Sequence, residues 1–383
     1  MTIVRRAVMA TTAMTLGLSL AACGGDLTQE SSGSDSSGTI KLGMLTPLSG
    51  SSAAIGPYMR DGAQLAVDEI NAKGGVDGRK LSLTVEDEAC DPKTAAAGAA
   101  KLVSAGVRIS VGGYCSSATL PTLGIFDKAH IPMIVPAANS ADLLAEQRRN
   151  VFLINGTGIQ QAQAASKFIK AEGSGRVALV DDNTSYSTDI TKRTRDELGL
   201  LGIKVVTHQS VTAGESDYSG AVNTVLNSTA DFVYWTGYYQ EGGLLIKQLR
   251  AAGYQGKIMV ADGSVDGKLI EIAGKSNAQG VFATMTQTPQ TIPGGQAWIA
   301  KYKKKFGSDP GPYSTQAYDA VRVAAEAVAV AGSTDGQAVI EALEQIDGFK
   351  IFSGPLNFTI QHALKVGGFD ILVVKGDDFA LNR

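Results

Sequence analysis

The feature that most constrains this chain is a repeated alternation of short apolar runs with helical stretches, which begins at Thr39 and continues almost to the end. The run Leu81–Asp87 alternates like a strand, whereas the stretch before it places Ala63, Val67 and Ile70 at helical spacing. Strands that alternate with helices pair in parallel through right-handed crossovers. We therefore expect an α/β protein built on parallel sheets.

The same pattern gives approximate bounds for each element. Strands are expected at 39–45, 81–87, 109–113, 132–136, 151–154, 176–181, 203–208, 231–236, 257–261, 280–286, 351–358 and 369–375. Helices are expected at 56–73, 94–104, 159–172, 187–200, 218–227, 240–252, 296–306 and 312–331. Glycines that end a helix, such as Gly74-Gly75, separate helices from the strands that follow.

The number of elements is too large for one core. About 360 residues follow an N-terminal leader, and chains of that length usually split into more than one compact body. We expect two doubly wound lobes, one from 39–158 plus 288–364 and the other from 159–287 plus 365–383. Three connections near 154–159, 285–290 and 362–368 would then form a three-stranded hinge between the lobes.

The first residues have the composition of an export signal. Arg5 and Arg6 precede an apolar run that ends in Leu20-Ala21-Ala22-Cys23, and this run is too short for a stable membrane anchor. Small residues before a cysteine resemble the lipobox of bacterial lipoproteins. We expect 1–22 to be a lipoprotein signal peptide, Cys23 to carry lipid, and 23–38 to be a flexible tether. Ordinary secretory cleavage is the alternative, and both predict an extracytoplasmic protein.

Two cysteines remain once Cys23 is assigned to lipid. An exported compartment is oxidising enough for Cys90 and Cys115 to form a disulfide, although two free thiols are the alternative. The loop so closed would contribute about 3 kcal/mol in the chain-entropy model. Two cysteines and three scattered histidines show no zinc-ligand spacing, so we expect no metal site.

Charge and motifs exclude several classes of function. Lys+Arg 34 against Asp+Glu 37 provides no strong field for nucleic acid or anionic lipid. The sequence lacks a P-loop, a complete dinucleotide loop and a GxSxG elbow, so we expect neither an enzyme nor a cofactor. An enzyme using the acids Asp87, Glu88 and Asp91 is the rival hypothesis, although a polar loop around Cys90 explains these acids equally well.

Polar residues follow several of the predicted strands. Ligands of open α/β sheets bind beyond the carboxyl ends of the strands. Ser116 and Asn139 lie there with backbone N–H groups at helix starts, a combination that binds a carboxylate, and Asp262 could face an ammonium group. Helix capping for Ser116 and Asn139, and a turn role for Asp262, are the alternatives. Three aromatic residues stand near such ends or ahead of a helix and could equally belong to a core: Tyr186, Tyr238 and Tyr313.

At this point the chain resembles the branched-chain amino-acid-binding protein family, the Leu/Ile/Val-binding receptors of ABC importers. The likeness runs from about Thr39 to the end. Its strongest stretches are 85–94 (VEDEACDPKT), 113–119 (GYCSSAT) and 134–139 (IVPAAN), with 71–75, 212–217 and 231–238 also close. The resemblance implies the type I periplasmic binding protein fold and a disulfide between Cys90 and Cys115.

The resemblance also implies roles for individual residues. Ser116, next to Cys115, matches a hydroxyl that binds the ligand α-carboxylate, and Ala137 matches a carbonyl that accepts from the α-ammonium. Asn139 stands where the family has a threonine that touches both groups. Four further positions complete the implied pocket: Asp262 for a glutamate paired to the ammonium, Tyr186 and Tyr238 for aromatic residues that close over the ligand, Tyr313 for a phenylalanine and Ile55 for a tyrosine.

The positions at which this chain differs from the family pattern affect the ligand specificity that we expect. Asn139 keeps a polar side chain and adds an N–H₂ donor, so carboxylate binding should survive. Asp262 keeps the charge but is one methylene shorter than glutamate, so the ion pair must be rebuilt or bridged by water. Ile55 and Tyr313 alter the side-chain pocket, where each methylene is worth about 1–3 kcal/mol. An amino-acid head group and an apolar side chain are therefore favoured.

The implied function is that of a monomeric receptor. It would capture an amino acid, most probably of the branched-chain type (Leu, Ile or Val), by closure of the lobes, and deliver it to an ABC transporter permease. A sensor of amino acids or amides with the same fold, which signals to a partner, is the alternative. No nucleic acid is expected as a partner, and contact with the membrane would be made by the lipid on Cys23.

Overall fold

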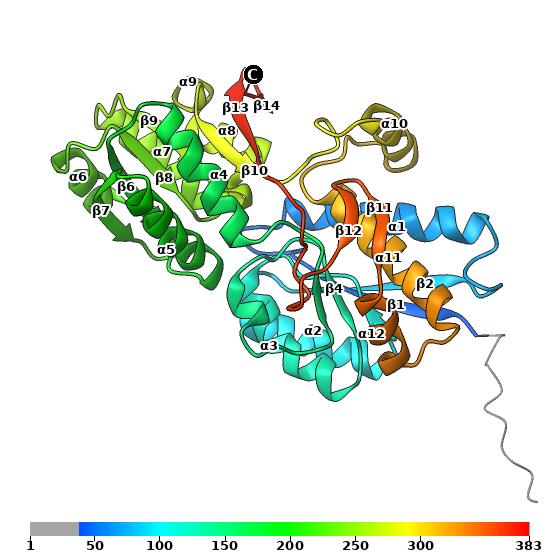
Figure 1. Ribbon diagram of the computed structural model, residues 1–383. Coiled ribbons are helices and arrows are strands. Elements are labelled where there is room, and N and C mark those ends of the chain that lie inside the picture. The colour runs from blue at the N-terminus through cyan, green and yellow to red at the C-terminus, as the bar shows by residue number, and fades with distance from the viewer. Residues whose placement is uncertain (1–37, 383) are drawn as a thin grey trace, which may run out of the picture. The chain divides into compact units, whose positions relative to one another are not determined.

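The computed structural model describes residues 38–382. The predicted signal peptide, the lipid site Cys23 and almost all of the tether lie outside the described residues. Contacts unite the described chain into one compact unit, which contains two large sheets and one small hairpin. Below, lobe 1 means the first sheet with the helices that pack on it, and lobe 2 means the second sheet with its helices (Figure 1).

The sheet of lobe 1 is wholly parallel. Its strands are β1 (Ile40–Thr46), β2 (Leu81–Asp87), β3 (Ile109–Ser110), β4 (Met133–Val135) and β5 (Val151–Leu153), in the order β2-β1-β3-β4-β5. Each pair in this order is parallel, with Leu42 opposite Leu83 and Ile134 opposite Phe152. Parallel strands covered on both faces are apolar throughout, which explains the short continuous apolar runs of the sequence.

The sheet of lobe 2 is mixed. Its strands are β6 (Arg176–Asp181), β7 (Lys204–Ser210), β8 (Phe232–Trp235), β9 (Lys257–Val260), β10 (Phe282–Met285), β13 (Asp370–Lys375) and β14 (Asp378–Leu381), in the order β14-β13-β10-β9-β8-β6-β7. The five strands from β10 to β7 are parallel, whereas β13 and β14 run antiparallel. The strands β11 (Asp347–Ile351) and β12 (Gly354–Asn357) form the separate hairpin.

Helices cover the sheets. Those of lobe 1 are α1 (Ile55–Ala72), α2 (Pro92–Ser104), α3 (Ser116–Lys128), η1 (Ala141–Leu144), α10 (Gly295–Phe306), α11 (Ser314–Ala331) and α12 (Gly336–Glu344). Those of lobe 2 are α4 (Gly158–Ala171), α5 (Ser185–Leu200), α6 (Ser219–Asn227), α7 (Tyr239–Ala251), η2 (Asp262–Ser264), α8 (Gly267–Ala273) and α9 (Lys275–Ala278). In lobe 1, α1 packs with α11 and α2 with α3, and in lobe 2, α4 packs with α5 and α7 with α8.

Local sequence signals fix several helix starts. Asp91 caps α2 by accepting from the backbone N–H of Thr94, and Pro92 occupies the first turn, where its missing N–H costs nothing. Thr157 and Gln160 form a reciprocal capping box at α4. This second cap holds the start of α4 at the connection that enters lobe 2.

The predicted elements agree with the structure, with three corrections. The strands after the first two of lobe 1 are shorter than predicted, since β3 retains only two paired residues. The predicted strand at 351–358 is instead the hairpin of β11 and β12, turned at Phe352–Ser353. Helices α8, α9 and α12 and strand β14 were not predicted, because they are short or lie in polar stretches with weak periodicity.

Three connections join the lobes and overlap the predicted hinge stretches. They run from β5 to α4, from β10 to α10, and from β12 to β13 (Figure 1). Because β5 and β10 end at Leu153 and Met285, the first two connections begin within a residue of the predicted positions. The chain therefore crosses three times between one sheet and the other.

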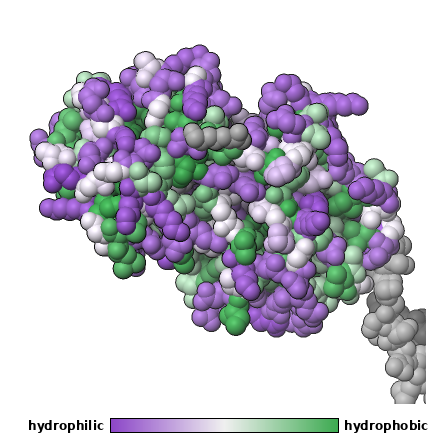
Figure 2. Space-filling model, turned by 45° about the horizontal axis from the view of Figure 1, so that its top comes forward, coloured by the Kyte–Doolittle hydropathy of each residue, from purple (hydrophilic) through white to green (hydrophobic). Residues whose placement is uncertain are grey.

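The described surface is mostly hydrophilic, and Figure 2 shows apolar residues as separate patches on the visible face. The large apolar side chains that are exposed come from different elements: Leu48, Ile159, Leu200, Val330, Ile360 and Val366. Within residues 38–382 we find no helix with the length and apolar character that a membrane span requires.

The Cys90–Cys115 disulfide ties the loop after β2 to the start of α3. The two Cα atoms lie 5.2 Å apart, within the normal range for a disulfide. Cys115 is the residue that precedes α3, so the bond fixes the backbone at the point where Ser116 begins the helix.

Replacing Cys90 and Cys115 together by serine should lower the free energy of unfolding by about 3 kcal/mol, because the unfolded chain gains freedom in the loop that the bond closes. Urea unfolding of both proteins measures the loss. Reduction of the unchanged protein with dithiothreitol should reproduce it. An unfolding midpoint that reduction leaves in place would show that the cysteines are not paired in the purified protein.

Candidate functional site

A buried carboxylate lies at the centre of the site. Asp262 begins η2, directly after β9, and is 1% exposed. Its Oδ1 accepts from Gln161 Nε2 at 2.8 Å and from the Tyr186 hydroxyl, and its Oδ2 accepts from the Tyr313 hydroxyl at 2.7 Å. Gln161 and Tyr186 belong to lobe 2, whereas Tyr313 precedes α11 in lobe 1. The carboxylate is therefore bonded from both lobes.

Burial dominates the electrostatics of this carboxylate. It raises the pKa of Asp262 above its ordinary value, and the hydrogen bonds from Tyr186, Tyr313 and Gln161 act in the opposite direction. All three partners are neutral donors. Among the described residues no ion pair reaches Asp262, although buried charges in proteins are usually paired. A cation placed here would therefore be strongly favoured.

Four tyrosine rings surround the carboxylate. Tyr186 contacts Tyr238 with ring centroids 5.1 Å apart, and Tyr238 contacts Tyr114 at 5.8 Å. Tyr114 in turn meets Tyr313 edge-on at 5.4 Å. Because Tyr186 and Tyr313 both donate to Asp262, the four rings and the carboxylate close a circle that passes from lobe 2 to lobe 1 and back.

The predicted residues of lobe 1 lie on two neighbouring loops. Ser116 is fully buried at the start of α3, and its Oγ accepts from the backbone N–H of Ser140 at 3.3 Å. The carbonyl of Ala137 accepts from Asn155 Nδ2 at 2.8 Å. Asn139 is 1% exposed and donates across to Gln161 Oε1 at 3.1 Å. The loops after β3 and β4 thus meet, as expected for the carboxyl ends of adjacent parallel strands.

The remaining predicted residues have simpler surroundings. Tyr238 precedes α7 and is 8% exposed, in contact with two other rings. Ile55 begins α1 and is buried in the same hydrophobic cluster as the four tyrosines. Cys115 is in the disulfide, and its backbone N–H is bonded to Glu88. The predicted roles of these residues toward a ligand stay predictions.

Three residues of the site were not predicted as such. Tyr114 completes the circle of rings, and its hydroxyl approaches the Gly263 carbonyl at 3.4 Å. Gln161 lies within α4, and no sequence signal marks it, because it is a residue inside a helix and does not directly follow a strand. Glu88 was considered only as part of an acidic loop, but it is fully buried.

Glu88 holds the backbone before α3. Its Oε1 accepts from the N–H groups of Cys115 at 2.9 Å and Tyr114 at 3.2 Å. Burial raises the pKa of Glu88 to about 7, and the two backbone hydrogen bonds oppose that shift. This carboxylate is thus a support for the loop that presents Ser116.

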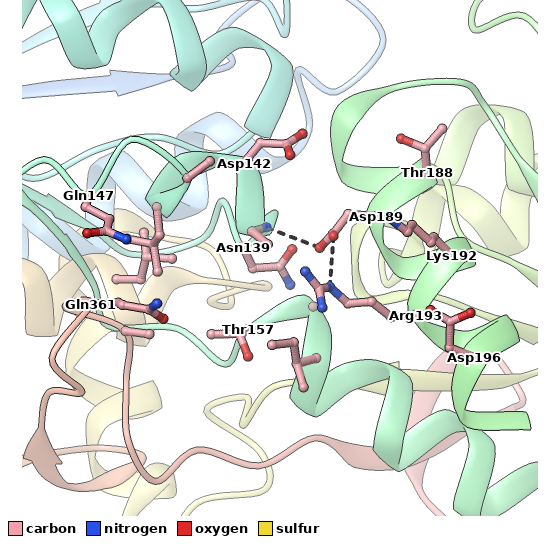
Figure 3. Close-up of a pocket in the computed structure, with 17 residues that line it drawn as sticks. Asn139, Asp142, Gln147, Thr157, Thr188, Asp189, Lys192, Arg193, Asp196 and Gln361 are labelled. Atoms are coloured by element: carbon pink, nitrogen blue, oxygen red, sulfur yellow. Dashed lines mark hydrogen bonds and ion pairs between the residues drawn. The ribbon is translucent and has the colours of Figure 1, made fainter. Parts of the chain in front are cut away.

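A cavity of about 580 Å³ extends from Asn139 between the two lobes (Figure 3). Lobe 1 contributes Asp142 and Gln147, and α5 of lobe 2 contributes Asp189 and Arg193. Arg193 Nε binds Asp189 Oδ1 at 2.8 Å, while Asp189 Oδ2 accepts from the backbone N–H of Ala141 at 3.2 Å. Figure 3 shows Asn139 between the glutamine side chains on one side and the charged side chains of α5 on the other.

Fold and site together define a two-lobed solute-binding protein, and comparison with known proteins gives its family. Residues 39–378 match the periplasmic binding protein family, so the chain belongs to that family. Its members are extracytoplasmic receptors for solutes and not enzymes, and the chain has their type I fold.

Individual relatives cover most of the chain. The leucine-, isoleucine-, valine-, threonine- and alanine-binding protein of Pseudomonas aeruginosa is 32% identical over 336 residues, which span 88% of this chain and 89% of the relative. A branched-chain amino acid transporter substrate-binding protein from Streptococcus pneumoniae, solved with isoleucine, superposes with a TM-score of 0.82 at 26% identity. That match covers 90% of this chain and all of the other. A leucine-binding protein from Thermotoga maritima gives the same TM-score at 25% identity, with 90% and 98% covered.

Replacing Glu88 by glutamine should change how stability depends on pH. The folded pKa of about 7 lies above the ordinary 4.5, so the stability associated with the protonated group is complete below about pH 4.5 and is lost as the pH rises through 7. Relative to Glu88→Gln, the free energy of unfolding of the unchanged protein should fall by roughly 3 kcal/mol as the pH rises from about 4.5 through 7.

Urea unfolding at several values from pH 4.5 to pH 8 measures this difference. The variant Glu86→Gln, on the preceding strand, corrects for the loss of one carboxylate. If the free energies of unfolding of the unchanged protein and of Glu88→Gln changed equally with pH, Glu88 would not have the raised pKa that its burial predicts.

Proposed function

We propose that this protein is a receptor that binds an amino acid between its two lobes and delivers it to the permease of an ABC importer. The observation that carries the proposal is the Asp262 carboxylate, which is buried, surrounded by neutral donors and reached from both lobes. Such a group favours a cationic partner, and the α-ammonium of an amino acid supplies one.

The carboxylate of the ligand would bind on lobe 1. The first turn of α3 has backbone N–H groups without partners inside the helix, and the helix dipole adds positive potential. Ser116 contributes its hydroxyl at that point, and Glu88 with the Cys90–Cys115 disulfide fixes the turn. A zwitterionic head group would thus meet a donor-rich loop and an anionic group on opposite lobes.

Closure follows from this division of the site. The ligand would stabilise the closed arrangement because only that arrangement lets lobe 1 and lobe 2 contact it together. Bonds across the cleft support this idea: Ser185 N–H donates to Ser117 Oγ at 3.1 Å, and Tyr313 donates to Asp262. The three connections would act as the hinge.

An apolar, branched side chain is the preferred ligand side chain in this proposal. Ile55, Tyr114, Tyr238 and Tyr313 would line its pocket, and each is buried. The named ligands of the Pseudomonas relative and the isoleucine of the Streptococcus structure support a small apolar side chain. Cys23 would anchor the receptor to the outside of the membrane by lipid, within reach of the permease.

Thermal unfolding with single amino acids, amides and sugars tests the function. A ligand present at 100 times its Kd should add about 2.7 kcal/mol to the free energy of unfolding. Leucine, isoleucine or valine should raise the melting temperature, and sugars should not. A shift with amides alone would favour the sensor hypothesis. The absence of a shift with every α-amino acid would refute the proposal.

Replacing Asp262 by alanine should weaken amino-acid binding by about 3 kcal/mol, or roughly 100-fold, because the desolvated ammonium loses its anionic partner. Asp262→Asn is the matched variant: it preserves the shape and an acceptor oxygen but removes the charge. Titration calorimetry with the best amino acid measures both. A change of less than threefold in Asp262→Ala would contradict the ammonium assignment.

A further inference from the structure

Gln161 links the two lobes through its side-chain amide. It lies in the first turns of α4 and is fully buried. On its own lobe, Nε2 donates to Asp262 Oδ1 at 2.8 Å and to Thr284 Oγ1 at 3.0 Å. Toward lobe 1, Oε1 accepts from Asn139 Nδ2 at 3.1 Å. One amide group therefore connects the buried acid of lobe 2 with a ligand-facing loop of lobe 1.

The acceptor role of Asp262 fixes the direction of this chain of bonds. A carboxylate only accepts, so the group facing Asp262 must be the N–H₂ of Gln161. The oxygen of Gln161 then faces Asn139, and it can be satisfied only by the N–H₂ of Asn139. Reversal of either amide would bring two acceptors together.

The oxygen of Asn139 remains after these bonds are made. Asn139 Oδ1 is buried and has no hydrogen-bond partner among residues 38–382. Asn139 also lines the cavity of about 580 Å³ between the lobes, so this buried and unpartnered acceptor belongs to a residue at the cavity wall (Figure 3). An unsatisfied buried acceptor costs about 1–3 kcal/mol, so a donor that reaches it is favoured by a similar amount.

Two other acceptors near this loop already have donors. The Ala137 carbonyl accepts from Asn155 Nδ2, and Asp262 accepts from three side chains. Asn139 Oδ1 is thus an acceptor on lobe 1 that a ligand can engage without displacing a bond of the protein, and the buried Oδ1 of Asn155 is likewise without a partner among residues 38–382. This polarity depends on Gln161, which does not itself need to touch the ligand.

We propose that Gln161 is a positioning residue that sets the polarity of the binding cleft. It orients Asn139 so that an oxygen faces the ligand, and it thereby selects ligands that carry an N–H or O–H donor at the α position. This inference rests on the proposed amino-acid binding and adds the residue that enforces the choice of head group.

Ligand analogues test the polarity in the unchanged protein. Leucine, its 2-hydroxy acid, its 2-keto acid and 4-methylpentanoate share one side chain and differ at the α position. The hydroxy acid, which can donate, should bind at least about 10-fold more tightly than the keto acid, which can only accept. Equal binding of the two, or tighter binding of the keto acid, overturns the inference even if leucine binds.

Variants then test whether Gln161 is responsible. Gln161→Met keeps the length of the side chain but removes all three of its hydrogen bonds, which leaves the Asn139 amide free to reverse. The preference for the hydroxy acid over the keto acid should fall about 10-fold, whereas the preference for leucine over alanine should be unchanged. Gln163→Met, two residues along α4, is the control, because Gln163 points to Glu197 and away from the cleft.

A purely structural role of Gln161 would weaken all ligands by the same factor, and that result would overturn the inference. Gln161→Glu is the second variant: it is isosteric but places an acceptor against Asp262, so it should also lose the preference. Circular dichroism and melting temperatures show whether each variant is folded. If no amino acid binds the unchanged protein, the proposed function itself is wrong. If leucine binds and both folded variants still prefer the hydroxy acid over the keto acid, only the role of Gln161 is wrong.

Discussion

The desolvation of one carboxylate is the constraint on which the rest of the site depends. Asp262 is removed from water at the end of β9, and its oxygens accept hydrogen bonds from neutral donors of the two lobes. Such an arrangement is incomplete without a cation, since hydrogen bonds recover only part of the lost hydration. The circle of tyrosines, the amide of Gln161 and the bonds that cross the cleft all hold this carboxyl group inside the protein.

Two departures from the Leu/Ile/Val-binding pattern fit together at this carboxylate. Aspartate is one methylene shorter than the glutamate that the family pattern implies, and Tyr313 stands where a phenylalanine is implied. The hydroxyl of Tyr313 reaches Asp262 Oδ2 at 2.7 Å, so the added hydroxyl contacts the shorter acid. Tyr313 is held at φ +61°, a conformation that costs a non-glycine residue of order 1 kcal/mol, and this places its ring at the cleft.

Much of the fold could be predicted because its physical signals are local. The strand Leu81–Asp87 and the strand Arg176–Asp181 have the predicted bounds, since apolar runs flanked by turns report burial directly. The helix at 336–344 and the antiparallel strand at 378–381 were missed because each is short, although each packs on the element that precedes it in the sequence. In the candidate site, the residues that the sequence predicts are mostly those that follow strands, and Gln161 on a helix is not among them.

The sequence by itself determined the α/β class and the two lobes, and it pointed to the loops of the candidate site, because hydrophobic periodicity and strand-end residues are properties of short segments. Its motifs likewise determined the family. Only the tertiary structure decided which atoms of those loops face each other. Hydrogen bonds run from Asp262 through Gln161 to Asn139, and four tyrosines close around the acid. Some of the residues joined in this way, such as Gln161 and Asp262, are more than 100 positions apart in the sequence. Such long-range pairings leave no period in the sequence, since each depends on the packing of two separate lobes.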